Sequence, residues 1–319
     1  MKKKKISAII ACYKDEKAIP VMYDRLTNIF RKIKVNYELI FVNDGSPDNT
    51  EKVLRFIARK DKHVIAVNHS RNFSSQMAFT SGMDIASGNA VILLDGDLQD
   101  PPEIIEKFYT KWLEGYDVVY GVRRKRVAPI FMQFAYKLFY RIFHRISYIS
   151  IPFDAGDFSL IDRKVVDVLK TFPERDRFLR GLRAWVGFRQ TGVSYVRPER
   201  MFGKTTNNFL KNFSWATKGI FSFSYVPLQM MTILSLLVFT FSIIAMIIQI
   251  TLKLIWPESA PHGTTTILIA VLFIGSTQLL CISILGEYIG KIFEEVKQRP
   301  KYIVKEIFKF NDNHRNIKK

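Results

Sequence analysis

The chain has 319 residues, of which 48% are hydrophobic and 24% charged, and its 48 basic and 29 acidic residues give a net charge of +19. This length allows about two domains, and this composition excludes a disordered or collagen-like chain. The two cysteines, Cys12 and Cys281, indicate no disulfide framework, so we expect a reducing compartment. The basic excess indicates an anionic partner, which is nucleic acid, a membrane surface or a phosphate-bearing substrate.

Strand and helix signals alternate over the first 121 residues. The apolar run Ile6–Ala11 follows four lysines, but it is shorter than the ~7–15-residue core of a signal peptide and instead predicts a buried strand. The βα alternation predicts a mostly parallel, doubly wound sheet, in which ligands bind beyond the carboxyl ends of the strands. The expected strands are Ile6–Cys12, Glu38–Asn43, Val64–Asn68, Ala90–Leu94 and Asp117–Tyr120, with helices over Ala18–Lys34, from Asp48, over Ser74–Ala86 and from Asp100.

Two basic segments then break the alternation. Residues 123–148 combine apolar and aromatic residues at helical spacing with basic residues at four-residue steps, and residues 209–223 form a second such segment. A helix of this kind suits a membrane interface, although an amphipathic helix packed on the sheet has the same pattern. Residues 101–218 carry +11 of the net charge, whereas the parts before and after them carry +4 each.

The last third of the chain contains two long stretches without a charged side chain, Gly219–Leu252 and Ser259–Gly286. Roughly 18 apolar residues are enough to cross a bilayer, whereas buried core helices rarely exceed about 14. We therefore predict two transmembrane helices, about 227–252 and 264–288, with buried core helices as the alternative. Basic residues flank the outer sides of the pair, so the positive-inside rule predicts that both termini are cytoplasmic.

Asp95-Gly96-Asp97, at the end of the fourth expected strand, is the sharpest local signal for chemistry. Divalent cations such as Mg²⁺ take oxygen ligands, usually one or two carboxylates together with substrate phosphates. Such an ion would neutralise a leaving diphosphate. An isolated Asp-x-Asp pair is most often a solvated turn, but its place at the end of a buried strand favours a metal site.

Further motifs follow one another along the chain. They are DGS at 44–46, SRNF at 70–73, DGDLQDPP at 95–102, DAGDFSLIDR at 154–163, PERDRFLRG at 173–181, Arg197 and Arg200 before GKT at 203–205, and GEYIG at 286–290. The first three resemble the inverting family 2 glycosyltransferases with the nucleotide-sugar-binding GT-A fold. The later ones, with two C-terminal spans, are similar to the polyprenyl-phosphate glycosyltransferases, of which the bactoprenol glucosyltransferases are the closest type. The similarity covers roughly residues 5–303.

This resemblance implies inverting transfer of a hexose from a nucleotide diphosphate sugar to undecaprenyl phosphate. UDP-glucose is the first choice of donor, with N-acetylglucosamine, galactose and mannose donors as alternatives. The implied location is the bacterial inner membrane, with a cytoplasmic catalytic domain and a homotetrameric assembly. The expected parts are a nucleotide-sugar-binding half (1–122), an acceptor half with interface helices (123–226), the two spans (227–290) and a basic cytoplasmic tail (291–319).

The resemblance also implies roles for individual residues. Asp44 would contact the base or ribose, Asp95 and Asp97 would hold the diphosphate through Mg²⁺ or Mn²⁺, and Asp157 would lie near the acceptor. The expected catalytic residues are Asp157, Asp97, Arg200 and Lys204, and the expected substrate-binding residues are Tyr13, Glu16, Asp44, Ser46, Arg71, Asp95, Gln99, Arg123 and Arg126. Arg123 and Arg126 are included on electrostatic grounds, whereas Arg200 and Lys204 would face the lipid phosphate or the diphosphate.

The acceptor bears on the role of Asp157. A phosphate monoester carries about −1.5 to −2 charge near pH 7 and needs no deprotonation before it attacks. Positioning and charge neutralisation should therefore dominate, and we expect Asp157 to orient groups rather than to abstract a proton.

Four departures from the family pattern bear on nucleotide contacts and donor choice and leave the metal carboxylates intact. They are Ala11 for the usual Pro, Lys14 for Asn, Ser74-Ser75-Gln76 for a Gly-Lys-Glu-like run and Gly96 for Ala.

Two other classes of protein share parts of this pattern. A processive polysaccharide synthase would carry a Gln-x-x-Arg-Trp motif, which the nearest stretch, residues 181–185, lacks, and two spans are too few for a polymer channel. A non-catalytic membrane scaffold would have no need of Asp95, Asp97 and Asp157. Nucleic acid is not an expected partner, because the basic segments interleave with membrane-type aromatic residues and adjoin the spans.

Overall fold

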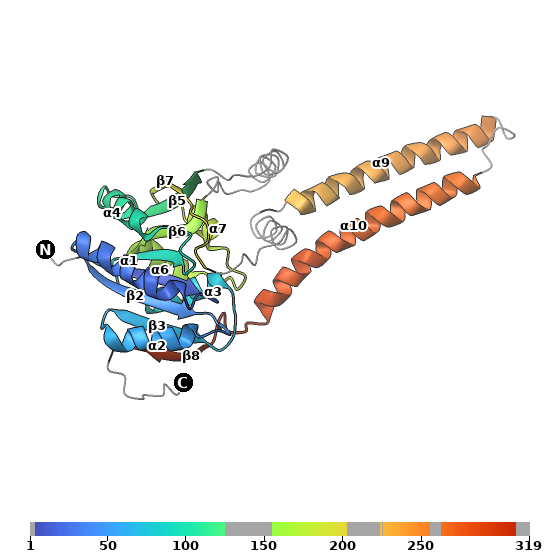
Figure 1. The fold of residues 1–319 in the computed structure, drawn as a ribbon. Coiled ribbons are helices and arrows are strands. Elements are labelled where there is room, and N and C mark those ends of the chain that lie inside the picture. The colour runs from blue at the N-terminus through green and yellow to red at the C-terminus, as the bar shows by residue number, and fades with distance from the viewer. Residues whose placement is uncertain (1–3, 125–154, 203–223, 225, 256–262, 311–319) are drawn as a thin grey trace. The chain divides into compact units, whose positions relative to one another are not determined.

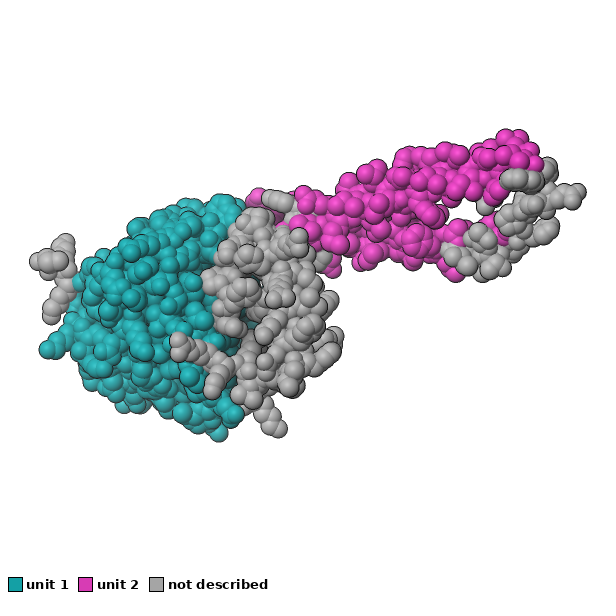
Figure 2. All heavy atoms as spheres, turned by 90° about the horizontal axis from the view of Figure 1, so that it is seen from above, with its two compact units in different colours: residues 1–144, 149–215, 299–319 teal, residues 145–148, 216–298 magenta. Residues whose placement is uncertain are grey.

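The computed structural model describes residues 4–124, 155–202, 224, 226–255 and 263–310. The two basic segments predicted as interface helices, apart from residues 123 and 124, lie outside these ranges, as do Arg126 and Lys204. The chain divides into two compact units (Figure 2). The first contains the sheet and takes in residues 299–319 from the end of the chain, and the second contains the two long apolar helices.

The first unit is built on an eight-stranded sheet with the order β7-β5-β6-β4-β1-β2-β3-β8 (Figure 1). The neighbours β4-β1-β2-β3 all pair in parallel, whereas β6 runs antiparallel to β4 and β5, and β8 runs antiparallel to β3. This arrangement confirms the predicted mostly parallel α/β sheet and all five predicted strands. The strands are β1 Lys5–Cys12, β2 Asn36–Asn43, β3 Val64–His69, β4 Ala90–Asp95, β5 Val118–Arg124, β6 Ala155–Asp162, β7 Gln190–Val196 and β8 Val304–Phe308.

Helices cover both faces of the sheet, which explains why β1 is a continuous apolar run. Successive side chains of a strand point to opposite faces. Ile6, Ala8 and Ile10 belong to the same core cluster as residues of α1, α2 and α4, whereas Ile9 meets α3 at Gly82. The helices of this unit are α1 Ala18–Lys32, α2 Thr50–Lys60, α3 Ser75–Ile85, the 3₁₀ turn η1 Pro102–Ile104, α4 Ile105–Leu113, α6 Arg163–Thr171 and α7 Leu179–Trp185.

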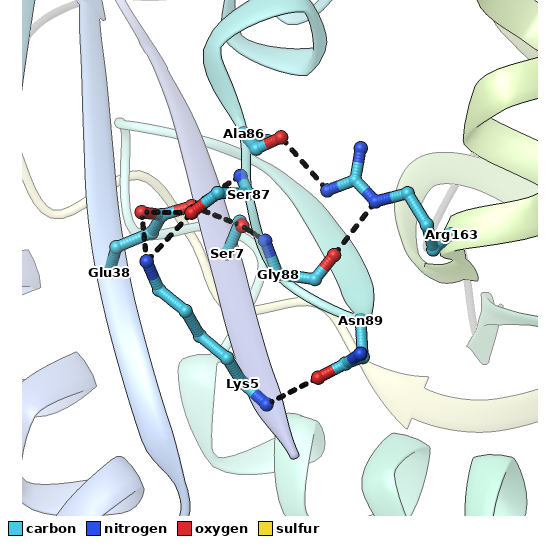
Figure 3. Close-up of polar contacts among 8 residues, drawn as sticks. All are labelled: Lys5, Ser7, Glu38, Ala86, Ser87, Gly88, Asn89 and Arg163. Atoms are coloured by element: carbon cyan, nitrogen blue, oxygen red, sulfur yellow. Dashed lines mark hydrogen bonds and ion pairs between the residues drawn. The ribbon is translucent and has the colours of Figure 1, made fainter. Parts of the chain in front are cut away.

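A buried polar network ties together the edge of the sheet opposite the carboxyl ends of β1 and β2 (Figure 3). Glu38, which is 7% exposed, accepts hydrogen bonds from Lys5 Nζ at 2.6 Å, Ser7 Oγ at 2.6 Å and the Ser87 N–H at 2.7 Å. Burial raises the pKa of Glu38, but these hydrogen bonds outweigh it and leave the pKa below its usual value. Arg163 donates to the carbonyls of residues 86 and 88, so the turn between α3 and β4 is held from both sides.

The second unit contains α9 Val226–Ile255 and α10 Thr264–Val296, which lie side by side (Figure 1). Both are long and apolar enough to cross a membrane, over Val226–Leu252 and Ala270–Val296, and neither stretch is buried in the structure. Hydroxyl groups in α9 donate to backbone carbonyls of their own helix, which satisfies them without water. These hydroxyls belong to Thr232, Ser235, Thr240, Ser242 and Thr251.

The end of the chain differs from the expected basic tail at 291–319. Helix α10 continues past the expected end at residue 288 as far as Val296, and Val304–Phe308 then forms β8 at the edge of the sheet. Apolar and polar residues do not alternate in Val304–Phe308, where Lys305 and Glu306 are adjacent, so the sequence pattern did not reveal this strand. Its place in the sheet depends on the free edge of β3.

Candidate active site

The predicted functional loops meet at one edge of the sheet because three parallel pairings end together. Cys12 pairs in register with Asn43, Asn43 with Asn68, and Ala11 with Asp95. The loops that follow β1, β2, β3 and β4 therefore start side by side. This edge is where a doubly wound sheet binds its ligands.

The loops after β2 and β3 touch through Gly45. This residue has a φ of +62°, and a Cβ atom there would lie 2.3 Å from the backbone carbon of Arg71. Glycine is therefore required both for the left-handed conformation and for the close approach of the two backbones. The contact brings Asp44 and Arg71, which are 27 residues apart in the sequence, into the same group of loops.

Asp44 is 2% exposed and its Oδ1 has two partners. The backbone N–H of Phe73 donates to it at 2.8 Å, and Nδ1 of His69 lies 2.9 Å away. Arg71 is exposed, and its guanidinium lies 4.3 Å from the centre of the Phe73 ring. The carboxylate is thus rigidly held, while the neighbouring cation is free to meet a ligand from solvent.

The loop after β1 is tied to the loop after β2. Ser46 Oγ accepts a hydrogen bond from the Lys14 N–H at 2.8 Å, and Glu16 Oε2 accepts one from the Asn49 N–H at 2.8 Å. These contacts give Ser46 and Glu16 a part in shaping the two loops. Tyr13 is 37% exposed, so its ring is open to a ligand at the rim of the site.

The loop after β4 concentrates negative charge. Burial raises the pKa of Asp95 well above its usual range, and the carboxylates of Asp100 and Asp97 raise it further. Asp97 Oδ1 accepts a hydrogen bond from the Gln99 N–H at 3.1 Å, which holds the turn. Such a cluster favours a divalent cation, which would offset the repulsion between the carboxylates. Within the described ranges, no three His, Cys, Asp or Glu side chains come close enough to hold an ion by themselves, so substrate oxygens would have to complete the coordination.

Arg200 links the loop after β1 to this acidic turn. Its Nη2 lies 3.2 Å from Asp15 Oδ1, and its Nε lies 3.9 Å from Asp97 Oδ2. Burial raises the pKa of Asp15 to about 6, although the Tyr13 N–H and Arg200 act in the opposite direction. Arg200, a predicted catalytic residue, is therefore placed beside Asp97, one of the two predicted metal carboxylates.

Arg123 lies near Asp100, which follows the acidic turn. Its Nη2 is 3.8 Å from Asp100 Oδ1, and its Nε donates to the Tyr195 hydroxyl at 3.3 Å. The same hydroxyl donates to Asp100. Arg123 was expected to bind substrate on electrostatic grounds. The structure places it beside the acidic cluster, at the carboxyl-terminal part of β5.

Asp157, in β6, is held by Arg180 and Gln76, neither of which was among the expected site residues. Arg180 Nη2 lies 3.3 Å from its Oδ2, and Gln76 Nε2 donates to the same oxygen at 3.2 Å. Gln76 Oε1 in turn accepts from the Leu179 N–H at 2.8 Å, at the start of α7. Burial raises the pKa of Asp157, but Arg180, followed by other nearby arginines, outweighs it and leaves the pKa below its usual value.

Sequence reasoning missed several residues of this edge, and each had a weak signal. Asp15 adjoins the predicted Tyr13 and Glu16, Asp100 belongs to the quoted DGDLQDPP motif, and Arg180 lies in the quoted PERDRFLRG motif. Gln76 lies in the quoted Ser74-Ser75-Gln76 departure from the family pattern. His69 and Tyr195 had no local signal, because a single polar residue in or beside a buried element is usually structural.

Comparison with known proteins decides the family. Residues 7–169 match the model of glycosyl transferase family 2, and the chain is 38% identical over 309 residues to the SfII prophage-derived bactoprenol glucosyl transferase of Shigella flexneri, covering 96% of this chain and 99% of that protein. The chain belongs to glycosyl transferase family 2.

This family 2 glycosyltransferase has other relatives of similar length. It is 42% identical over 308 residues to an uncharacterized glycosyltransferase of Synechocystis sp., with 95% of each chain covered. Among solved structures, it resembles the glucosyl-3-phosphoglycerate synthase from Mycobacterium tuberculosis in complex with Mn²⁺ and UDP. That match is 19% identical, with a TM-score of 0.42, over 68% of this chain and 77% of that one.

Proposed function

We propose that this glycosyltransferase transfers a hexose, in the first place glucose from UDP-glucose, to undecaprenyl phosphate. The observation that carries the proposal is the acidic turn Asp95–Asp97 with Arg200 beside it, in a chain that matches a bactoprenol glucosyl transferase over nearly its full length. The carboxylates suit the donor diphosphate with a cation, and the arginine suits an anionic acceptor.

Donor binding is assigned to the loops after β1, β2 and β3. Asp44 would accept hydrogen bonds from the base or ribose, and Arg71 and Tyr13 would lie at the rim of the nucleotide site. Asp95 and Asp97 would hold Mg²⁺ or Mn²⁺, since a buried carboxylate with a strongly raised pKa fits a cation. When bound, the ion supplies charge neutralisation for the leaving diphosphate.

The transfer needs no general base. An oxygen of the acceptor phosphate forms a bond to the anomeric carbon while the bond from that carbon to the diphosphate breaks. The electron pair of the broken bond leaves with the nucleoside diphosphate, and the configuration at the carbon inverts. Arg200 would offset the repulsion between the two phosphate groups, and Lys204 and Arg126 are proposed for the same task.

Asp157 is proposed to orient groups rather than to move a proton. Arg180 and Gln76 hold its carboxylate from two directions, and its lowered pKa makes it a weak base at neutral pH. An ionised Asp157 fixed in this way would position the acceptor-side arginines and the sugar hydroxyl groups. This role accords with the expectation for a phosphate acceptor.

The membrane assignment rests on α9 and α10. We propose that both helices cross the bacterial inner membrane, with the sheet-containing unit and both termini on the cytoplasmic side. The lipid acceptor, undecaprenyl phosphate, and the soluble nucleotide sugar would both reach the catalytic unit on that side of the membrane. A homo-oligomer remains part of this proposal, as the resemblance to polyprenyl-phosphate glycosyltransferases implies.

The test is sugar transfer by the purified full-length protein in detergent. Undecaprenyl phosphate is incubated with UDP-glucose, UDP-N-acetylglucosamine, UDP-galactose or GDP-mannose in the presence of Mg²⁺ or Mn²⁺. The expected product is an alkali-stable, acid-labile lipid-linked glucose, and a different preferred sugar would revise the donor alone. No product with any donor, from protein that is folded and monodisperse, would contradict the proposed function.

A further inference from the structure

The nucleotide side of the site extends into the segment that follows the last apolar helix. After α10 ends at Val296, β8 pairs with β3, and Val304 lies opposite His69. The Ser70 N–H donates to the carbonyl of Ile303 at 3.0 Å, directly before the Arg71 loop. The end of the chain therefore forms part of the wall behind the nucleotide-binding loops.

His69 connects this segment to Asp44. Its side chain is fully buried, its Nδ1 lies 2.9 Å from Asp44 Oδ1, and its ring stacks on Tyr302 with centres 5.4 Å apart and planes 14° apart. Phe73 packs edge-on against the same ring at 5.7 Å. Aromatic packing on two sides leaves the imidazole little freedom to turn.

The hydrogen-bond partners of His69 decide which of its two ring nitrogens carries the proton. Nε2 of His69 is buried and has no hydrogen-bond partner among the described residues, so Asp44 is the polar partner that the ring faces. A carboxylate only accepts, so the proton is assigned to Nδ1, which donates to Asp44 Oδ1. With the Phe73 N–H, this saturates Oδ1 and leaves Oδ2, which makes no hydrogen bond to any described residue, for a ligand.

Tyr302 is itself held in place. Its hydroxyl donates to Asp84 Oδ2 in α3 at 2.6 Å, and the neighbouring Lys301 Nζ donates to the Phe172 carbonyl at 2.7 Å. The ring that supports His69 is thus anchored to two elements of the sheet-containing unit. These anchors are 218 and 129 residues away in sequence, so they form only when the chain end returns to the sheet.

We propose that His69 is a positioning residue of the donor site, which aims Asp44 Oδ2 at the nucleotide, and that Tyr302 keeps His69 in place. This inference rests on the proposed function, in which Asp44 contacts the base or ribose. It makes nucleotide binding depend on the segment after the last span, which is otherwise remote from the donor. The chemical class of the ligand concerned is a nucleoside diphosphate.

The test compares two substitutions of nearly equal size in the full-length protein. His69→Asn keeps an N–H donor near the position of Nδ1, whereas His69→Leu removes it. We expect His69→Leu to raise the Kd for UDP, measured by calorimetry with Mg²⁺, by about 10- to 100-fold, as for the loss of a hydrogen bond to a charged group. The KM for UDP-glucose should rise in parallel, while kcat and the acceptor KM change by less than about threefold. His69→Asn should recover most of the affinity.

A second pair of variants tests the support from the chain end. Tyr302→Phe keeps the ring that stacks on His69 but loses the hydrogen bond to Asp84, so its loss of UDP affinity should be smaller than that of Tyr302→Ala, which should show the defect of His69→Leu. Unchanged UDP binding by His69→Leu, or equal losses in the Asn and Leu variants at equal thermal stability, would overturn the inference. Failure of the parent protein to bind any nucleoside diphosphate would instead contradict the proposed function, and the inference with it.

Discussion

Arg180 and Asp157 form an ion pair, with Nη2 of the arginine 3.3 Å from Oδ2 of the aspartate, between the start of α7 and β6. The pair explains how a buried carboxylate remains ionised, since burial alone would raise its pKa and the arginine reverses that effect. It also separates two possible roles of Asp157. A carboxylate held by a cation is suited to orienting other groups and poorly suited to accepting a proton.

The first prediction concerns this ion pair. Arg180→Met removes the cation, so the pKa of Asp157 should rise, and protonation should then compete with its orienting role. We expect kcat to fall about 10- to 100-fold at pH 7, as for a misplaced catalytic group. The ratio of variant to parent activity should fall further as the pH is lowered from about 8 to about 6. The acceptor phosphate also titrates in this pH range, but it affects the variant and the parent equally, so its effect drops out of the ratio.

Arg180→Lys is the matched control for that experiment. It keeps a positive charge near Asp157 and should retain a pH-independent ratio, with a smaller loss of kcat because the two-nitrogen geometry is lost. A ratio for Arg180→Met that stays constant with pH would show that Arg180 does not control the ionisation of Asp157.

The second prediction concerns the acidic turn. Asp97→Asn preserves the shape of the side chain and the hydrogen bond from the Gln99 N–H, but it removes one of the two proposed metal carboxylates. Transfer should fall by at least about 100-fold, because a bound metal supplies several kcal/mol of charge stabilisation. In thermal denaturation, the added stability that Mn²⁺ and UDP together give the parent should be lost.

The control for this experiment is Asp167→Asn in α6, an aspartate that is 59% exposed and pairs with Arg163 on the same helix. It changes the net charge equally and should leave both transfer and the Mn²⁺ response unchanged. Full activity in Asp97→Asn would contradict the assignment of Asp97 as a metal carboxylate and place the metal elsewhere.

The third prediction concerns backbone strain at Ser74. This residue precedes α3 with φ +82° and ψ +158°, a region that side chains other than glycine rarely adopt. Ser74→Gly should therefore stabilise the protein by about 1 kcal/mol, which corresponds to a rise in Tm of about 2–4 °C. Ser75→Gly is the matched control, because Ser75 begins the helix and glycine should lower the Tm there. An unchanged or lower Tm in Ser74→Gly would contradict the strain.

The fourth prediction concerns the network around Glu38 (Figure 3). Its folded-state pKa lies below its ordinary value of 4.5, so the carboxylate stabilises the fold above that pH and loses this effect as the pH falls through the folded-state pKa. Glu38→Gln should lower the Tm by about 4–8 °C at pH 7, as for about 2 kcal/mol. The difference from the parent should shrink below about pH 4.

Glu106→Gln is the control for Glu38→Gln. Glu106 is 47% exposed and pairs with Lys32 on the surface, so its removal should change the Tm by less than about 2 °C. A Tm difference for Glu38→Gln that is independent of pH would show that the network acts through packing rather than through the charge.

The sequence predicted the central part of the fold well. The five strands of the first 124 residues were readable because apolar runs and helical periodicity are local signals, and the parallel sheet follows from their alternation. The strand β8 was not readable, since its five residues join the sheet only through the free edge of β3. The acidic turn was also readable, because both carboxylates lie within three residues at the end of an apolar run.

The partners of the site residues required the tertiary structure. Gln76 and Asp157 are 81 residues apart, and nothing in either local sequence indicates that they meet. The same holds for Tyr302 and His69, which stack across the edge of the sheet. The periodicity of the sequence shows which face of a helix or strand is buried. Strand register and packing decide which side chains of other elements that face contacts. The amino-acid pattern alone thus determined the sheet and the position of the acidic turn at the end of a strand, and only the folded chain decided how Asp44 and Asp157 are held.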